Sequence, residues 1–127
     1  MKENDCIVDI IEIDEERCEG LKSLEWLNRV IHGDVRGVDE LVETNYDMVL
    51  WSHGPEMLER KDIVPTINKL LGITKKLIIL MAPWGNSPYR HNKTPLYEED
   101  LRRLGFKTST LGVKDERESN LLAWKKV

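Results

Sequence analysis

The sequence predicts an α/β protein built on an open, mostly parallel sheet, with helices on both faces and an antiparallel hairpin at its C-terminal end. Three observations predict this class. Apolar, β-branched runs alternate with segments of helical periodicity. The run from Leu77 to Met81 is apolar throughout, as a strand covered on both faces requires. Two strand-like segments joined by a charged turn end the chain, and the length of 127 residues fits a single domain over 1–127.

The first half of the chain predicts three strands and two helices. Cys6 to Ile13 is rich in β-branched residues, which favour a strand. Asp14-Glu15-Glu16 suits the first turn of a helix, because acidic side chains stabilise a helix N-terminus. This helix carries an apolar stripe of Cys18, Leu21, Leu24 and Leu27. The elements expected after it are a strand at Arg29–His32, a short helix at Val38–Val42 and a strand at Tyr46–Trp51.

The second half predicts two helices around the apolar strand, and then the hairpin. Asp62 is expected to cap a helix that ends before Gly72. After Pro83 the longest loop, Trp84 to Lys93, shows no periodicity. Thr94-Pro95 is typical of a helix start. The remaining expected elements are that helix, up to Gly105, and strands at Phe106–Leu111 and Asn120–Val127.

Composition excludes several classes of protein. The formal net charge is -4 and charges of both signs are interspersed, so no basic face for nucleic acid is expected. Cys6 and Cys18 lack the paired spacing of a zinc or redox site, and His32 and His91 show no ligand spacing, so we expect reduced thiols, no metal site and a cytoplasmic protein. No apolar stretch has the length of a membrane span or the character of a signal peptide.

Candidate ligand-binding residues stand where parallel strands end, because ligands of open α/β sheets bind outside the carboxyl ends of the strands. Glu12 closes the first strand, and its carboxylate can accept both hydroxyls of a ribose. It can equally be a solvated acid beside a helix N-terminus. Asp34 can accept from an adenine amino group while the amide of Val35 donates to the ring, or it can simply cap the next helix.

The stretch Asp47 to Glu56 is the most informative, because a buried strand runs directly into Trp51, Ser52 and His53. His53 is the candidate general base, since its ordinary pKa lies near neutrality; the alternative is a hydrogen-bonding spacer. Trp51 either walls a pocket or belongs to the core. Glu56 is expected to cap or pair locally, and the loop Trp84–Lys93 to act as a substrate lid or as a surface connection.

The chain resembles the class I S-adenosylmethionine-dependent methyltransferases, which are Rossmann-like, from the second strand of that family onward. Ile10 to Glu16 resembles the family's acidic strand end, and Val30 to Val35 its adenine-contacting turn. Tyr46 to Met57 is similar to the motif beside the transferred methyl group, and Leu104-Gly105-Phe106 to the start of the family's final hairpin.

The resemblance implies S-adenosylmethionine as cofactor and methyl transfer to an unidentified small-molecule or protein acceptor. Glu12 would hold the ribose, Asp34 and Val35 the adenine, and Trp51 to His53 the sulfonium side. The first alternative is a non-catalytic domain of the same fold that binds or stabilises a partner. The second is a nucleotide-binding α/β protein of another family.

That family begins with another strand and a Gly-x-Gly loop, so we expect the chain to be N-terminally truncated relative to it, either as a fragment of a longer reading frame or as a natural variant. No two glycines here stand in that relation. In the family this strand lies between those that correspond to Cys6–Ile13 and Tyr46–Trp51. We therefore expect these two strands to pair directly, the alternative being a second chain that fills the gap. Exposed sheet edges also favour a homo-oligomer.

Overall fold

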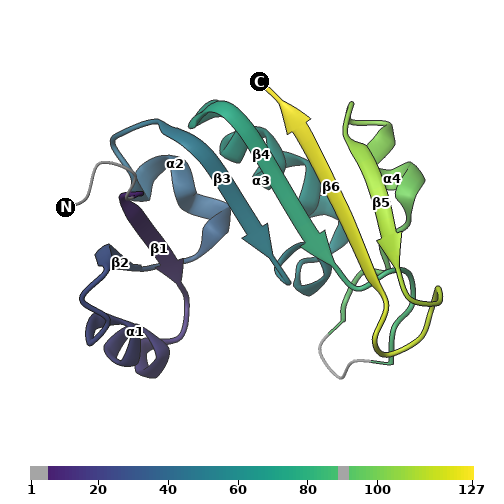
Figure 1. Ribbon diagram of the computed structural model, residues 1–127, viewed down its shortest axis with the longest axis horizontal. Coiled ribbons are helices and arrows are strands. Elements are labelled where there is room, and N and C mark those ends of the chain that lie inside the picture. Colours follow the sequence, from purple (N-terminus) through teal and green to yellow (C-terminus); the bar gives the residue numbers. More distant parts are fainter. Residues whose placement is uncertain (1–5, 89–91) are drawn as a thin grey trace. The chain divides into compact units, whose positions relative to one another are not determined.

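The structure is a computed structural model that describes residues 6–88 and 92–127. The chain divides into two compact units, Met1–Glu43 and Thr44–Val127, which we call unit 1 and unit 2. Figure 1 traces the elements of each, and each unit is described by itself.

Unit 1 is a two-stranded parallel sheet with one packed helix. β1 (Val8–Glu12) leads into α1 (Glu15–Lys22), and β2 (Leu27–His32) leads into a 3-10 turn, η1 (Val35–Gly37), and the short helix α2 (Val38–Leu41). α1 begins where predicted because the Asp14 carboxylate accepts from the Arg17 amide at 2.9 Å. In the register of the sheet Glu12 lies opposite His32, so both strands end at the same level.

Unit 2 is a four-stranded mixed sheet in the order β3-β4-β6-β5. β3 and β4 are parallel, and β6 pairs antiparallel with both β4 and β5. The elements are β3 (Tyr46–Ser52), the 3-10 turn η2 (Pro55–Met57), α3 (Arg60–Gly72), β4 (Thr74–Ala82), α4 (Glu98–Arg102), β5 (Lys107–Leu111) and β6 (Asn120–Lys126).

The core of unit 2 lies between this sheet and its two helices, α3 and α4, which lie on the same face of it (Figure 1). Alternate strand residues point toward the helices, which is why Ile78, Leu80 and Leu121 are at most 1% exposed. The helices contribute Ile67 and Leu101, also fully buried. Full burial of such a side chain stabilises a fold by about 1.5–3 kcal/mol.

Two expectations about the sheet are wrong. In unit 2 it is mixed rather than mostly parallel, because β6 lies between β4 and β5 and is antiparallel to both. Within this unit the described helices α3 and α4 lie on one face of the sheet. β1 does not pair with β3: among the described residues β1 pairs with β2 and β3 with β4, in separate sheets. The remaining strands, and the C-terminal hairpin, are confirmed.

Three predicted helix caps, at Asp62, Gly72 and Thr94, are also wrong. α3 begins at Arg60, with Glu59 rather than Asp62 in the N-cap position, and it runs through Gly72. At the C-terminal end of α3 the Thr74 hydroxyl donates to the Leu70 carbonyl at 2.6 Å. This bond satisfies a carbonyl of the last turn, so no left-handed glycine is needed there. α4 begins only at Glu98, because Thr94 donates its hydroxyl to the Leu58 carbonyl at 2.6 Å and is held outside the helix.

Candidate functional site

Glu12 and Asp34 stand together at the carboxyl edge of unit 1. The strands β1 and β2 end side by side, and the Gly33 amide donates to the Glu12 carbonyl at 3.0 Å. His32 joins the same edge through a 2.9 Å hydrogen bond between its Nε2 and the Ile13 carbonyl. The sequence predicted that Glu12 and Asp34 follow strand ends at one edge, and the pairing of β1 with β2 brings those two ends together. It gave no role there to His32.

The Glu12 carboxylate is only lightly engaged. Its Oε1 accepts from the Asp14 amide at 3.3 Å and lies 3.6 Å from the Arg17 guanidinium, which is itself mostly exposed. The Glu12 side chain is 22% exposed. Weak local contacts and partial exposure leave this carboxylate able to accept further hydrogen bonds from a ligand.

Asp34 is firmly engaged by Arg36. The Arg36 amide donates to Asp34 Oδ1 at 2.9 Å, and the guanidinium donates to Oδ2 at 2.6 Å. This hydrogen bond from the guanidinium lowers the pKa of the Asp34 carboxyl, against a smaller opposing effect of burial. The capping role that the sequence left open for Asp34 is thus present, at the N-terminus of η1. A ligand at Asp34 would have to share this carboxylate with Arg36.

Trp51 lies in the core of unit 2. It is 8% exposed, on the face of β3 that α3 covers. Its indole lies so close to Gly54 that no side chain would fit there, which explains a glycine directly after the strand. Of the two roles predicted for Trp51, core residue or pocket wall, the structure supports the first.

Ser52 and His53 form an exposed corner at the carboxyl end of β3. His53 has a φ of 52°, in the left-handed region that non-glycine residues rarely adopt. Its backbone amide donates to the Met81 carbonyl at 2.7 Å, which fixes the corner. The imidazole is therefore presented to solvent on a rigid backbone at the edge where the sequence predicted it. Strain of this kind is often found at functional positions.

Glu56 is a buried carboxyl group whose importance the sequence did not reveal. It was expected to cap or pair locally, but it is 3% exposed, and its Oε2 has no hydrogen-bond partner in the described part of the chain. Burial raises the pKa of Glu56 to about 7. A hydrogen bond from its own backbone amide lowers the pKa, but by less than burial raises it. The one available signal was its position in a Gly-Pro turn directly after an apolar strand.

The loop after β4 is anchored at both ends. The Gly85 amide donates to the Leu96 carbonyl at 2.7 Å, and the Asn86 amide to Asp115 Oδ1 at 2.7 Å. Further along, the amides of Lys93 and Thr94 both donate to the Glu56 carbonyl. These segments are packed structural connections. The centre of the predicted lid, residues 89–91, lies outside the described residues.

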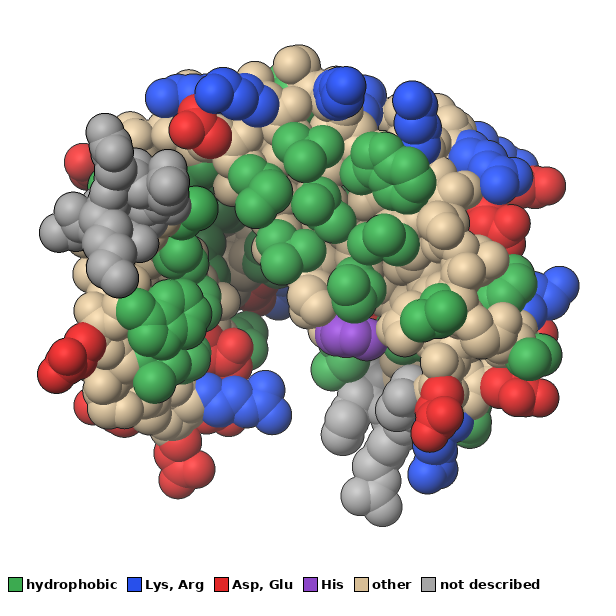
Figure 2. Space-filling view, viewed as in Figure 1, with side chains coloured by type: hydrophobic (Ala, Val, Ile, Leu, Met, Phe, Trp, Pro, Cys, Tyr) green, Lys and Arg blue, Asp and Glu red, His purple; other side chains and the backbone are tan. Residues whose placement is uncertain are grey.

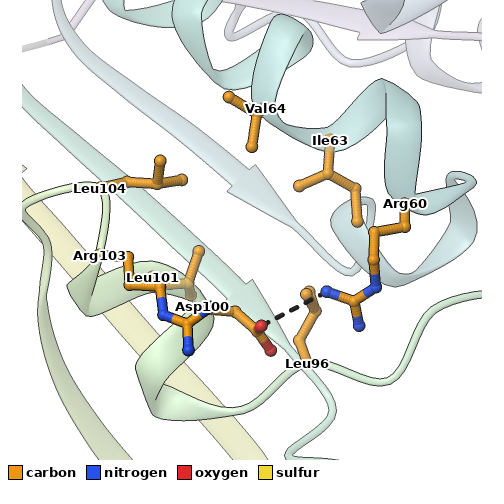
Figure 3. A pocket seen from close by; sticks show the side chains of 8 residues that line it. All are labelled: Arg60, Ile63, Val64, Leu96, Asp100, Leu101, Arg103 and Leu104. Carbon is orange, nitrogen blue, oxygen red and sulfur yellow. Dashed lines mark hydrogen bonds and ion pairs between the residues drawn. The ribbon is translucent and has the colours of Figure 1, made fainter.

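A separate cavity of about 200 Å³ lies between α3 and α4, and none of the predicted site residues lines it (Figure 3). Arg60 and Asp100 form an ion pair of 3.4 Å at its side. Its other lining residues are Ile63, Val64, Leu96, Leu101, Arg103 and Leu104.

Residues 6–88 and 92–127 contain neither a metal-binding cluster nor a membrane-spanning helix. No three His, Cys, Asp or Glu side chains in that part of the chain are grouped so that they could hold a metal ion. No helix there has the length and apolar character needed to span a bilayer.

Comparison with known proteins shows likeness in fold rather than in sequence. No family model matches the sequence, and no curated protein matches it. Solved structures do match. They include TehB from Haemophilus influenzae, at a TM-score of 0.73 and 12% identity, over 94% of this chain and 49% of that protein.

Two further solved structures are similar. Magnesium protoporphyrin IX methyltransferase (ChlM) from Synechocystis PCC 6803, with bound SAH, matches at a TM-score of 0.69 and 14% identity, over 94% of this chain and 64% of that protein. The N-methyltransferase NodS from Bradyrhizobium japonicum WM9 matches at a TM-score of 0.70 and 12% identity, over 94% of this chain and 72% of that protein. The chain thus spans about half to two thirds of the length of TehB and ChlM.

Proposed function

We propose that this chain, whose fold is that of the class I S-adenosylmethionine-dependent methyltransferases, serves methyl transfer from S-adenosylmethionine to an unidentified acceptor. The observation that carries the proposal is the pair of carboxylates, Glu12 and Asp34, at the adjoining ends of two parallel strands. Adjoining strand ends are where open α/β sheets bind nucleotides.

The residues of unit 1 fit the nucleoside part of this cofactor. Both described contacts of the Glu12 carboxylate are made by Oε1, so Oε2 is suited to accept from a ribose hydroxyl. Asp34 would accept from the adenine amino group and the Val35 amide would donate to the ring. Because the Arg36 side chain is half exposed, it can turn away from Asp34 at small cost.

Two titratable groups of unit 2 are suited to proton transfer. S-adenosylmethionine, when bound, supplies an electrophilic methyl group, and an attacking amine or hydroxyl must lose a proton. His53 is exposed on its fixed corner, and its imidazole would accept that proton. Ser52, also exposed, and the backbone of Trp51 would contact the sulfonium side. The second group is the carboxyl of Glu56, on the turn that follows.

A thermal-shift experiment with S-adenosylhomocysteine tests the proposal. A ligand at ten times its Kd stabilises the folded state by about 1.4 kcal/mol, which corresponds to roughly 5 °C here. We expect this shift in the wild type and in the control Glu25→Ala, an exposed acid of the same unit, and not in Glu12→Ala. No shift at millimolar ligand in the wild type would favour the non-catalytic alternative.

A further inference from the structure

The cavity between α3 and α4 lies apart from the candidate site, since neither the predicted site residues nor Glu56 line it. Its walls are mostly apolar. Ile63 and Val64 of α3 lie opposite Leu101 of α4 and Leu104, which follows α4 (Figure 3). Ile63 and Leu101 are buried, whereas Val64 is 43% exposed. The cavity thus has a buried apolar floor and opens to solvent beside Val64.

The mouth of the cavity carries one positive charge that nothing in the described part of the chain balances. Both oxygens of the Asp100 carboxylate are engaged: Oδ2 accepts from the Tyr97 amide at 2.8 Å, and Oδ1 lies 3.4 Å from Nη1 of Arg60. Asp100 and Arg60 therefore neutralise each other. Arg103 also lines the cavity and is exposed, and its guanidinium has no hydrogen bond or ion pair with a described residue. An anion at the mouth would supply the missing partner.

The volume of the cavity, about 200 Å³, limits what can enter it. A cavity of about 150 Å³ in another protein holds benzene, so this one accommodates about seven or eight carbon atoms. Drug-sized molecules and cofactors occupy about 300–1,000 Å³. A docked amphipathic helix inserts several side chains at i, i+3, i+4 and i+7, which also exceed this space. The cavity is therefore suited to a small molecule with a short apolar part.

We propose that the cavity between α3 and α4 binds a small amphipathic monocarboxylate, such as a fatty acid of about eight carbon atoms. Its hydrocarbon tail lies between the apolar side chains of α3 and those of Leu101 and Leu104. Its carboxylate accepts hydrogen bonds from the Arg103 guanidinium. For a ligand of about ten non-hydrogen atoms, ordinary ligand efficiency gives a Kd of about 0.1–1 mM. This inference does not depend on methyl transfer.

Titration of the methyl-labelled full chain with octanoate, followed by NMR, tests the inference. We expect saturable shifts of the Val64 and Leu104 methyl resonances. Octylamine, which has the same tail and a positive head group, should bind at least tenfold more weakly. Met48 and Leu50 report unspecific binding, because they are exposed on the sheet face opposite α3, where Figure 2 shows hydrophobic side chains gathered. No saturation by 10 mM octanoate, equal binding of octylamine, or equal shifts at Leu50 would overturn the proposal.

Three variants separate the two parts of the site. Arg103→Gln removes the positive charge and should weaken octanoate binding at least fivefold. The control Arg117→Gln changes an exposed arginine in the β5–β6 turn and should alter the Kd less than twofold. Val64→Phe places a larger side chain in the opening and should weaken binding at least fivefold, with all three variants folded by circular dichroism. Equal effects of Arg103→Gln and Arg117→Gln, or unchanged binding by Val64→Phe, would contradict binding at this cavity.

Discussion

The amide of His53 donates a 2.7 Å hydrogen bond to the carbonyl of Met81, which ties the corner after β3 to the end of β4. The same corner places His53 at a φ of 52°. Glycine adopts this conformation without strain, while alanine does not. We expect His53→Gly to be more stable than His53→Ala by about 1 kcal/mol in urea denaturation. Equal stability of the two variants would show that the corner relaxes.

The buried Glu56 should make the stability of unit 2 depend on pH. Its pKa in the folded state, about 7, lies above its ordinary value of 4.5, so the folded state holds the proton more tightly than the unfolded state. Stability is therefore greatest below about pH 4.5 with respect to this group, and it falls as the pH rises to about 7. The loss amounts to at most about 3 kcal/mol.

Denaturation of Glu56→Gln between pH 4.5 and 8 measures this contribution. The variant should lose the pH-dependent decrease, because its side chain does not ionise. Glu118→Gln, which changes an exposed carboxyl group in the β5–β6 turn, should retain the decrease. The same pH profile in Glu56→Gln and wild type would mean that Glu56 is not the titrating group.

Gly85 and Gly72 should respond oppositely to alanine. Gly85 has a φ of 83°, and a Cβ there would collide with Asp115 Oδ1, which holds the Asn86 amide. Gly72 lies in α3 with open space around it. We expect Gly85→Ala to destabilise the protein by about 1–3 kcal/mol and Gly72→Ala to stabilise it by about 0.5–1 kcal/mol, as measured by thermal unfolding. Neutral behaviour of Gly85→Ala would contradict the described anchoring of the loop.

Arg36 should compete with a nucleoside for Asp34. In Arg36→Met the pKa of the Asp34 carboxyl should rise toward its ordinary value, because the guanidinium hydrogen bond is lost. The freed carboxylate should bind S-adenosylhomocysteine more tightly, by about threefold to tenfold, since a charged hydrogen bond no longer has to be displaced. Calorimetric titration of both proteins checks this. Weaker binding by the variant would contradict this prediction and would mean that Arg36 contacts the ligand directly.

The order of elements could be predicted from the sequence, but the strand partners could not. Apolar runs and helical stripes depend on local periodicity, and they located β1, β3, β4 and the hairpin within a few residues. Pairing depends on contacts between distant segments, so the expected pairing of β1 with β3 was wrong. The start of α4 was predicted too early, at Thr94-Pro95, because Leu96 forms a β-bridge with the distant Gly85.

The candidate site divides in the same way. The positions of Glu12, Asp34 and His53 at the ends of strands could be predicted, because they depend only on the order of strands and helices. The ion pair of Asp34 with Arg36 and the burial of Glu56 depend on side-chain packing, which no short motif encodes.

The most direct test of the central claim, a nucleoside site at the carboxyl edge of unit 1, is titration of the ¹⁵N-labelled full chain with S-adenosylhomocysteine. The account predicts saturable shifts of the Gly33, Asp34 and Val35 amide resonances, which Glu12→Ala weakens at least tenfold and Glu25→Ala leaves unchanged. Resonances of these three amides that stay fixed at millimolar ligand, or shifts confined to the cavity between α3 and α4, would contradict it.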